Sequence, residues 1–286
     1  MNANSSLQTP AIKDWLNDAY RQLSDIGVPS ARLDAEILLA HALNKNRTYL
    51  PAHNTDNINK KTLTIADNYL LQRLNRVPTA YIIGYKEFYG RKFIVNPDTL
   101  IPRPESEDII TTLKQILPST IYYLPSTTYY LVDVGTGSGC LGITAKLEFP
   151  NLDVTLTDIS SSALVIAKKN AIKLSAKVNF VKSDLLITVP EKADIIIANL
   201  PYVDKSWERS IETDYEPPLA LLADDNGLSI IKKLITSAPN SLKTDGYLII
   251  ESDPVQHHIL IEHAKKNKLL PVHQLGYIIA FKLNKD

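Results

Sequence analysis

The spacing of apolar residues divides the chain into a helical first part and a longer part in which strands alternate with helices. In the first part, four apolar residues recur on one face of a predicted helix: Trp15, Ala19, Leu23 and Ile26. Similar amphipathic stretches follow over residues 30–43 and 63–74. Helices that each carry one apolar face must bury it against a neighbour. The pattern therefore predicts a small helical bundle over residues 1–78 that recognises or positions a substrate.

The helical spacing stops near residue 78, and residues 79–104 are predicted to form a linker or β-hairpin. Aromatic residues surround a glycine at position 90, as is common in hairpins. The segment ends with the sequence Pro102, Arg103, Pro104, Glu105. Prolines fix the backbone on either side of the arginine. The loop is therefore predicted to form the rim of a binding site, with Arg103 and Glu105 as candidate substrate-binding residues.

Between residues 105 and 286, strand-like apolar runs alternate with amphipathic helices. Strands are predicted over residues 130–134, 153–157, 177–181, 193–198 and 247–251, followed by a short pair around 272 and 277–281. This alternation predicts an α/β fold with a mostly parallel sheet that helices cover on both faces. Ligands of such sheets bind at the carboxyl ends of the strands, so the loops there are the candidate sites.

The loop after the first of these strands is a predicted cofactor site and is rich in glycine: Gly135, Thr136, Gly137, Ser138 and Gly139. Glycines let the backbone turn sharply and approach a ligand without a Cβ clash. Asp158 follows about 20 residues later at the end of the second strand, where its carboxylate can accept hydrogen bonds from both hydroxyls of a ribose. These residues predict a nucleoside-containing cofactor. Because residues 137–142 also fit a dinucleotide fingerprint, NAD and S-adenosylmethionine both remain candidates.

Other acidic residues near strand ends have less specific patterns. Asp184 and Leu185 are predicted to bind an adenine, the carboxylate through the exocyclic amine and the leucine against the ring. The alternative role for Asp184 is to cap a helix. Asp133 and Glu251 fit structural and functional roles equally well. The six histidines show no metal-ligand spacing, so no metal site is predicted.

The loop after the fourth strand, Asn199-Leu200-Pro201-Tyr202, distinguishes between the two cofactors. The Asn199 side-chain oxygen and the backbone carbonyl of Leu200 or Pro201 can accept the two N–H groups of a planar amide or aromatic amine. These acceptors favour the positive charge that develops on the nitrogen during methylation. Tyr202 can stack on the flat group and exclude water. Hydride transfer has no evident use for this loop, so the sequence predicts a methyltransferase with Asn199, Pro201 and Tyr202 as catalytic residues.

Composition and charge limit the partners and the compartment. The 31 Lys and Arg residues balance the 31 Asp and Glu residues, which argues against a protein that coats nucleic acid or an anionic membrane. The single cysteine excludes an intrachain disulfide and favours a reducing compartment. No stretch reaches the roughly 18 apolar residues of a membrane span, and the first ten residues lack the apolar core of a signal peptide. We therefore expect a cytoplasmic protein.

Several motifs together resemble one family. The glycine loop, Asp158 and residues 199–202 are similar to those of class I S-adenosylmethionine-dependent methyltransferases. Other segments resemble the release factor glutamine methyltransferases, the HemK/PrmC family: residues 81–84, 87–90, 101–107, 215–217, 219–221 and 227–228. The helical first part, with Trp15 and residues 34–39, resembles that family as well. The resemblance therefore extends over almost the whole chain.

The resemblance implies a fold and a reaction. The fold is a Rossmann-like sheet, mostly parallel with an antiparallel last strand, preceded by the helical bundle. The reaction is methylation of N5 of the glutamine in the Gly-Gly-Gln motif of peptide chain release factors, with S-adenosylmethionine as cofactor. The bundle would hold the protein substrate, and residues 199–202 would hold the glutamine amide, with Asn199 also near the cofactor's methyl group. A monomer without direct nucleic-acid binding is expected.

Departures from the family pattern leave two alternatives. Leu200 stands where the family usually has proline, and Asn-Leu-Pro-Tyr resembles the loop of ribosomal RNA adenine dimethyltransferases. Leu185 stands where an aromatic residue is common, and Ser106 replaces a usual threonine. The alternatives are an N6-adenine methyltransferase that acts on RNA or DNA and a non-catalytic adaptor that binds release factors. The neutral net charge argues against the first, and the intact Asn199, Pro201 and Tyr202 argue against the second.

Overall fold

The computed structural model describes residues 9–117 and 128–284, so the first eight residues of the predicted bundle lie outside the described part. The chain forms two compact units. The helical unit comprises residues up to Gly84 together with the segment Ser210–Tyr215. The sheet unit comprises Tyr85–Arg209 and the residues from Glu216 onward.

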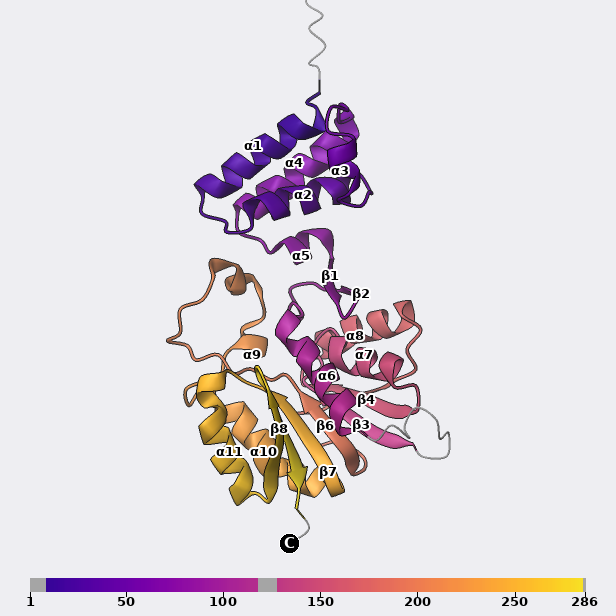
Figure 1. Cartoon of the computed structure of the whole chain (residues 1–286), viewed down its shortest axis with the longest axis vertical. Helices are drawn as coiled ribbons and strands as arrows, with labels where there is room; N and C mark the ends of the chain where they lie inside the picture. The colour runs from indigo at the N-terminus through magenta and orange to yellow at the C-terminus, as the bar shows by residue number, and fades with distance from the viewer. Residues whose placement is uncertain (1–8, 118–127, 285–286) are drawn as a thin grey trace, which may run out of the picture. The chain divides into compact units, whose positions relative to one another are not determined.

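The helical unit is a bundle whose helices are α1 (Ile12–Asp25), α2 (Ala31–Ala42), α3 (Tyr49–Ala52), α4 (Lys60–Leu74) and α5 (Thr79–Ile83). Figure 1 shows α1, α2 and α4 side by side. Trp15, Ala19 and Leu23 are buried in the core, as the helical spacing predicts. Ile26 is 37 % exposed, because α1 ends at Asp25 and the next residue no longer follows the helix face. The α5 helix lies within the predicted linker, where the sequence pattern did not indicate a helix.

A chain segment from far along the sequence completes the helical unit. The short 3-10 helix η3 (Ile211–Tyr215) contributes Glu212, whose Oε1 accepts from Nη2 of Arg73 at 3.0 Å. Nε of Arg73 donates to Oδ2 of Asp34 at 2.8 Å, and Arg76 also pairs with Glu212 at 3.2 Å. Arg73 and Asp34 are buried, and a buried charge is tolerated only when opposite charges and hydrogen bonds satisfy it. The segment that follows the Asn199 loop is thus tied to the bundle by an ion-pair network.

The sheet unit begins with a β-hairpin of β1 (Tyr85–Phe88) and β2 (Arg91–Ile94). The two turn residues, Tyr89 and Gly90, have φ of 50° and 71°. Two consecutive positive φ angles are characteristic of the tight turns that match the twist of paired strands. Phe88 and Phe93 pack edge to face in the core below the hairpin. The hairpin is therefore anchored to the sheet unit through its own aromatic residues.

A seven-stranded sheet forms the centre of this unit. Its strands are β3 (Tyr129–Val134), β4 (Leu152–Asp158), β5 (Asn179–Lys182), β6 (Ala193–Ala198), β7 (Leu242–Glu251), β8 (Leu269–Leu275) and β9 (Ile278–Leu283). The spatial order is β5-β4-β3-β6-β7-β9-β8, and β9 alone runs in the direction opposite to the other strands. The predicted α/β fold, a mostly parallel Rossmann-like sheet with an antiparallel last strand, is confirmed.

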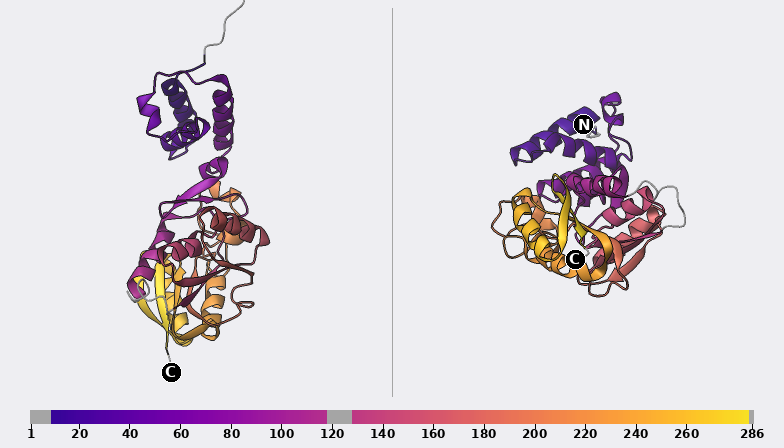
Figure 2. Two further views of the ribbon diagram at one scale, coloured as in Figure 1. Left: turned by 90° about the vertical axis from the view of Figure 1, so that its right-hand side faces the viewer. Right: turned by 60° about the horizontal axis from the view of Figure 1, so that its bottom comes forward.

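Helices cover the sheet on both faces (Figures 1 and 2). One face packs against α6 (Glu107–Ile116), α7 (Cys140–Glu148) and α8 (Ser161–Lys173). The other packs against α10 (Ser229–Ser241) and α11 (His257–Lys266). Successive residues of β3 alternate between the layers, with Leu131 in the first core and Val132 in the second. Because both faces are buried, the strands read as continuous apolar runs in the sequence.

Short elements precede or follow the larger helices: the 3-10 helices η1 (Pro104–Ser106) and η4 (Pro254–Gln256), and α9 (Pro218–Leu221). Among the residues that the structure describes, no helix is both long and apolar enough to cross a membrane.

Candidate active site

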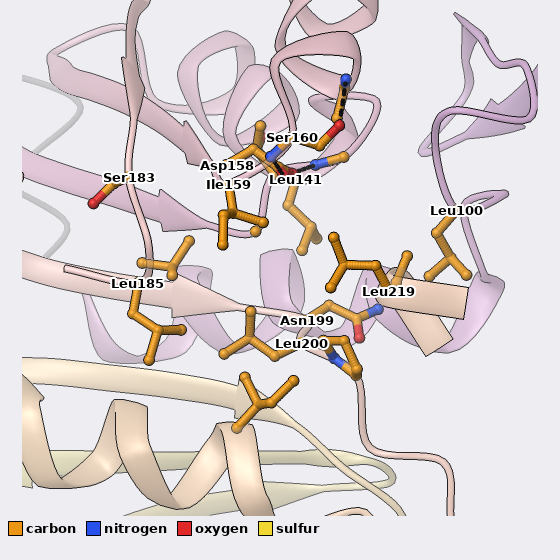
Figure 3. A pocket seen from close by; sticks show the side chains of 18 of the residues that line it. Leu100, Leu141, Asp158, Ile159, Ser160, Ser183, Leu185, Asn199, Leu200 and Leu219 are labelled. Atoms are coloured by element: carbon orange, nitrogen blue, oxygen red, sulfur yellow. Dashed lines mark hydrogen bonds between the residues drawn. The ribbon is translucent and has the colours of Figure 1, made fainter. Parts of the chain in front are cut away.

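A cavity of about 670 Å³ opens at the carboxyl ends of β3, β4 and β6. These three strands are neighbours, and the chain moves to opposite sides of β3 to form β4 and β6. Ligands of open α/β sheets bind at such a reversal of strand order. In Figure 3, Asp158 and Ser160 lie on one side of the cavity, with Asn199 and Leu200 on another. The two loops that the sequence singled out therefore meet in one cavity.

The glycine loop lines the cavity with its backbone. Gly135 and Gly137 have φ of 71° and 55°, a region that L side chains rarely adopt. A Cβ on Gly135 would lie 2.6 Å from Cδ2 of Leu200, so the end of the Leu200 side chain would have to move to admit it. Thr136 and Ser138 also line the cavity, but Gly139 does not. A Cβ on Gly139 would meet atoms of α7 and α8, which gives this glycine a packing role.

Asp158 lies at the end of β4 and faces the glycine loop. Its Oδ2 accepts from the backbone N–H of Gly137 at 2.9 Å, and its Oδ1 accepts from that of Ser160 at 2.8 Å. Burial raises the pKa of Asp158, while these backbone donors oppose the rise. Each carboxylate oxygen has a further lone pair, so Asp158 can accept from ribose hydroxyls while it holds the loop.

Asp133, which the sequence left between structural and functional roles, supports the loop from behind and does not line the cavity. Its Oδ2 accepts from the Thr136 hydroxyl and from the backbone N–H of Gly142 at 2.9 Å. Burial raises its pKa from 3.8 to about 6. Its Oδ1 is buried and has no hydrogen-bond partner within residues 9–117 and 128–284. Holding the loop in this way therefore costs folding stability, because it leaves one carboxylate oxygen of Asp133 buried without a donor.

Asp184 and Leu185 line the same cavity. The residues after Asp184 form a turn, closed by the N–H of Ile187 on the Asp184 carbonyl at 3.2 Å. No helix begins there in the described chain, so the alternative helix-capping role of Asp184 is not realised. Leu185 has a φ of 49°. A leucine in this backbone region is uncommon, and it presents an apolar side chain to the cavity (Figure 3).

The Asn199 loop lines the opposite side. Nδ2 of Asn199 donates to the hydroxyl oxygen of Ser106 at 2.9 Å. No described residue donates to its Oδ1, so this oxygen is available as an acceptor. Leu200 and Pro201 line the cavity beside it, and Leu200 is buried.

Tyr202 is held at both ends and does not line the cavity. Its backbone carbonyl accepts from Nε2 of Gln256 at 2.8 Å, and its hydroxyl donates to Oε1 of Glu251 at 3.1 Å. Gly227, with a φ of 81°, packs so closely that a Cβ there would lie 1.9 Å from the Tyr202 carbonyl oxygen. Burial and the nearby Glu251 raise the pKa of the Tyr202 phenol, which keeps it a hydrogen-bond donor. The predicted stacking of Tyr202 on a substrate stays a prediction.

The rim loop is fixed by a carboxylate that sequence reasoning did not single out as a site residue. Glu216 is buried, and its Oε2 accepts from the backbone N–H of Ile101 at 2.9 Å. Its Oε1 accepts from Nη2 of Arg103. Arg103 lines the cavity, whereas Glu105 is exposed and does not. The substrate-binding role of Glu105 stays a prediction.

Sequence reasoning therefore left three polar residues out of the site: Ser106, Glu216 and Glu251. Glu216 could have been found from the sequence, because residues 215–217 belong to a segment that resembles the family. Ser106 and Glu251 are brought to the Asn199 loop only by the tertiary fold. Among the described residues, no group of His, Cys, Asp and Glu side chains is arranged to hold a metal ion.

Two family models match the chain. The PrmC N-terminal domain matches residues 14–84, and the methyltransferase small domain matches residues 113–213. The methyltransferase match supports S-adenosylmethionine as cofactor over NAD. The glycine loop and Asp158 fit a nucleoside cofactor. The positive-φ glycines leave free space and backbone hydrogen-bonding groups at the cavity, and the Asp158 carboxylate adds hydrogen-bond acceptors.

Solved structures show the fold alone. A methyltransferase from Pyrococcus furiosus superposes with a TM-score of 0.53 at 20 % identity, covering 74 % of this chain and 98 % of that one. The 16S rRNA N2 G1207 methyltransferase of Thermus thermophilus, solved with AdoMet and guanosine, gives 0.52 at 14 % identity, covering 71 % of this chain and 50 % of that one.

Curated relatives are more similar. The release factor glutamine methyltransferase of Koribacter versatilis is 36 % identical over 259 residues, covering 87 % of this chain and 90 % of the relative. That of Leptospira interrogans is 37 % identical over 235 residues, covering 79 % and 80 %. A bifunctional methyltransferase of Rickettsia bellii is 35 % identical, but this chain spans only 48 % of its length. The predicted enzyme class is confirmed, and the chain belongs to the release factor glutamine methyltransferase family, whose cofactor is S-adenosylmethionine.

Proposed function

We propose that this protein transfers a methyl group from S-adenosylmethionine to the side-chain nitrogen of the glutamine in the Gly-Gly-Gln motif of peptide chain release factors. The observation that carries the proposal is the orientation of Asn199. Its Nδ2 is engaged by Ser106, which leaves Oδ1 as the acceptor at the cavity. An amide oxygen in this position suits a substrate that presents an NH2 group.

The chemistry needs acceptors more than it needs a strong base. The lone pair of an amide nitrogen is delocalised into its carbonyl, so the nitrogen is a poor nucleophile. Oδ1 of Asn199 and the backbone carbonyl of Leu200 or Pro201 would accept the two N–H groups and favour the charge that develops on nitrogen. The cofactor supplies an electrophilic methyl group. Transfer would break the methyl C–S bond, with its electrons left on sulfur, and would form a C–N bond to the glutamine nitrogen, which would release one proton to solvent.

Positioning supplies much of the remaining rate. The glycine loop and Asp158 would hold the cofactor, with Asp184 and Leu185 beside its adenine. Pro201 would fix the turn of the catalytic loop, and Tyr202 would cover the amide. Arg103, held by Glu216, would bind the substrate backbone at the rim.

The helical unit would hold the protein substrate. The match to a PrmC N-terminal domain supports that role. The zero net charge supports a protein partner rather than nucleic acid. We propose that the enzyme acts as a monomer in the cytoplasm, in keeping with its single cysteine.

Mass spectrometry of an unmethylated release factor after incubation with the protein and S-adenosylmethionine tests the proposal. We expect a gain of about 14 Da, one added CH2, on the Gly-Gly-Gln peptide with the wild type and none with Asn199→Ala, which removes the acceptor. No gain while the cofactor still binds would contradict the proposal. Methylation of adenine in an RNA or DNA substrate would then identify the alternative activity, and binding of release factors without turnover would identify an adaptor.

A further inference from the structure

The peptide unit between Tyr202 and Val203, at the end of the Asn199 loop, is held through both of its polar groups. The Tyr202 carbonyl accepts from Nε2 of Gln256 at 2.8 Å, and the Val203 N–H donates to the carbonyl of Leu221 at 3.0 Å. A peptide unit is planar, so holding its carbonyl and its N–H fixes the orientation of the plane. The chain therefore leaves the Asn199 loop in one fixed direction.

The side chain of Gln256 is buried, and backbone partners bind both ends of its amide. Nε2 donates to the carbonyls of Tyr202 at 2.8 Å and of Asn226 at 2.9 Å. Oε1 accepts from the backbone N–H of Asp253 at 3.2 Å. A carbonyl cannot donate and an N–H cannot accept, so these partners permit only one orientation of the amide. Both N–H groups of Gln256 are therefore used to hold two separate segments of backbone.

The second segment that Gln256 holds is a strained turn. Three consecutive residues, Asp225, Asn226 and Gly227, have φ of 60°, 55° and 81°. Residues other than glycine adopt this region at a cost that the surrounding structure must offset. A Cβ on Gly227 would lie 1.9 Å from the Tyr202 carbonyl oxygen and 2.6 Å from Nε2 of Gln256. A side chain at position 227 would therefore push the Tyr202 peptide unit away from Gln256.

We propose that Gln256 is a positioning residue that fixes the Asn199 loop for methyl transfer. It holds the Tyr202 peptide unit against the turn at residues 225–227. The inference rests on the proposed function, because the Asn199 loop would hold the glutamine amide. Gln256 does not line the cavity, so it acts through the loop and not by contact with the cofactor or the substrate.

A displaced peptide unit would move the acceptors of the loop. The ring of Pro201 fixes one of the backbone torsions between this unit and Asn199, which limits how far the chain can absorb a shift. Because Gln256 occupies the Tyr202 carbonyl, we expect the backbone acceptor for the substrate to be the carbonyl of Leu200 or Pro201. A displacement of about 1 Å in a reacting group can lower a rate by about 100-fold. Holding this peptide unit therefore matters for turnover.

The first test compares turnover in two Gln256 variants with a matched control. Gln256→Met keeps about the length of the side chain and removes both N–H donors, whereas Gln256→Glu keeps the shape and places an oxygen against two carbonyl oxygens. We expect Gln256→Met to lower kcat for a release factor about tenfold and Gln256→Glu to lower it further. The KM for the release factor and the affinity for S-adenosylmethionine should change by less than about threefold. Gln274→Met should retain wild-type kcat, since Gln274 is exposed and bonds to His257, the neighbour of Gln256.

The order of the two variants separates a hydrogen-bonding role of Gln256 from a packing role. Each variant is assayed at a temperature at which circular dichroism shows it folded. If Gln256 only fills space, then Gln256→Glu, the closer copy in shape, should be the milder substitution. A milder Gln256→Glu, or wild-type kcat in Gln256→Met, would overturn the proposal.

The turn at residues 225–227 provides a second test. Gly227→Ala places a Cβ against the Tyr202 carbonyl, and Gly90→Ala is its matched control. Gly90 has a similar φ of 71°, but a Cβ there would meet no described neighbour within 4 Å. We expect Gly227→Ala to lower kcat about tenfold or more and Gly90→Ala to change it by less than about threefold.

A double variant tests whether the turn and Gln256 act on the same peptide unit. Gly227→Ala and Gln256→Met should both displace the Tyr202 carbonyl, so their effects should not be independent. The double variant should then lose little more kcat than the more impaired single variant. Losses that multiply would overturn the proposal.

A measurement without turnover distinguishes failure of this inference from failure of the proposed function. The Val203 N–H is bonded to the Leu221 carbonyl, so its exchange with solvent deuterium, followed by NMR, reports how firmly the peptide unit is held. We expect exchange in Gln256→Met to be about tenfold faster or more than in the wild type and Gln274→Met. Equal exchange in Gln256→Met and the wild type would overturn the proposal. If the wild type methylates no release factor, the proposed function fails, while this exchange still decides whether Gln256 holds the loop.

Discussion

The two sides of the cavity differ in which atoms form them: backbone groups on one side and side chains on the other. The glycine-loop half, residues 135–138 with Asp158, presents backbone, and its one carboxylate is held by the backbone N–H groups of Gly137 and Ser160. The Asn199 half, residues 199–202 with their partners, depends on side chains that come from three separate elements, η1, β7 and η4. We therefore expect the backbone groups to form a general nucleoside site and the side-chain hydrogen bonds to fix the orientation of one amide.

The difference predicts that the two halves fail in different ways. Damage to the glycine-loop half should weaken cofactor binding, and damage to the Asn199 half should slow turnover with the cofactor still bound. The halves touch where Leu200 packs over Gly135. Substitutions on either side of that contact show how far the halves are independent.

The largest expected effect is on the Asn199 half. Asn199→Ala should lower kcat by about 100-fold or more, because it removes an acceptor for the charge that develops on the nitrogen. The dissociation constant for S-adenosylmethionine, measured by calorimetry, should change by less than about threefold. A cofactor affinity that falls in parallel with kcat would show that the two halves are not separable.

The next effect concerns Asp133, the buried support of the glycine-loop half. Its pKa of about 6 in the fold exceeds the ordinary 3.8, so the folded protein binds this proton more tightly than the unfolded chain. The resulting stabilisation is present below pH 4 and is lost as the pH rises through about 6. Asp133→Asn does not titrate, so its free energy of unfolding relative to wild type should rise by about 2 kcal/mol between pH 4 and pH 7.5. Denaturant unfolding of both proteins at the two pH values measures this, and an unchanged difference would contradict it.

A smaller effect is expected for the carboxylate that faces the cavity. Asp158→Asn puts an NH2 group against the backbone N–H of either Gly137 or Ser160. Leaving a donor unpaired, and losing an acceptor for ribose, should weaken S-adenosylmethionine binding by about tenfold. Turnover at saturating cofactor should fall much less, which a titration of initial rates against cofactor concentration would show. A loss confined to kcat would assign Asp158 to the other half.

The smallest effect is expected at the departure from the family pattern. Leu200→Pro should change kcat and cofactor affinity by less than about threefold, because Pro201 already fixes the turn. Steady-state kinetics would measure both values. A change beyond tenfold would mean that the Leu200 side chain, through its contact with Gly135, couples the halves.

The contrast between the two halves also explains which residues of the site could be predicted from the sequence. The glycine loop, Asp158 and Asn199 lie directly after apolar strands, so local patterns placed them at one edge of a parallel sheet, where the structure has them. Ser106 lies 93 residues before Asn199, and Glu251 lies 49 residues after Tyr202. No local periodicity links such positions, and only the packing of η1 and β7 around the loop brings them together.

Two further features could not be read from local patterns. Asp133 and Glu251 have the same sequence context, an acidic residue within or ending an apolar strand. One supports the glycine loop and the other holds Tyr202, because β3 leads into the glycine loop whereas β7 lies beside β6, the strand that leads into the Asn199 loop. Glu212 joins the helical unit although it lies 139 residues beyond Arg73, and no local pattern links two positions so far apart.

The most direct test of this account is a crystal structure with S-adenosylhomocysteine and a Gly-Gly-Gln peptide, at a resolution that separates amide oxygen from nitrogen. The account predicts the cofactor product against the glycine loop with its ribose on Asp158. It also predicts the glutamine nitrogen on Oδ1 of Asn199, whose Nδ2 stays on Ser106. An Asn199 amide that turns its nitrogen to the peptide, or a glutamine bound away from residues 199–202, would contradict it.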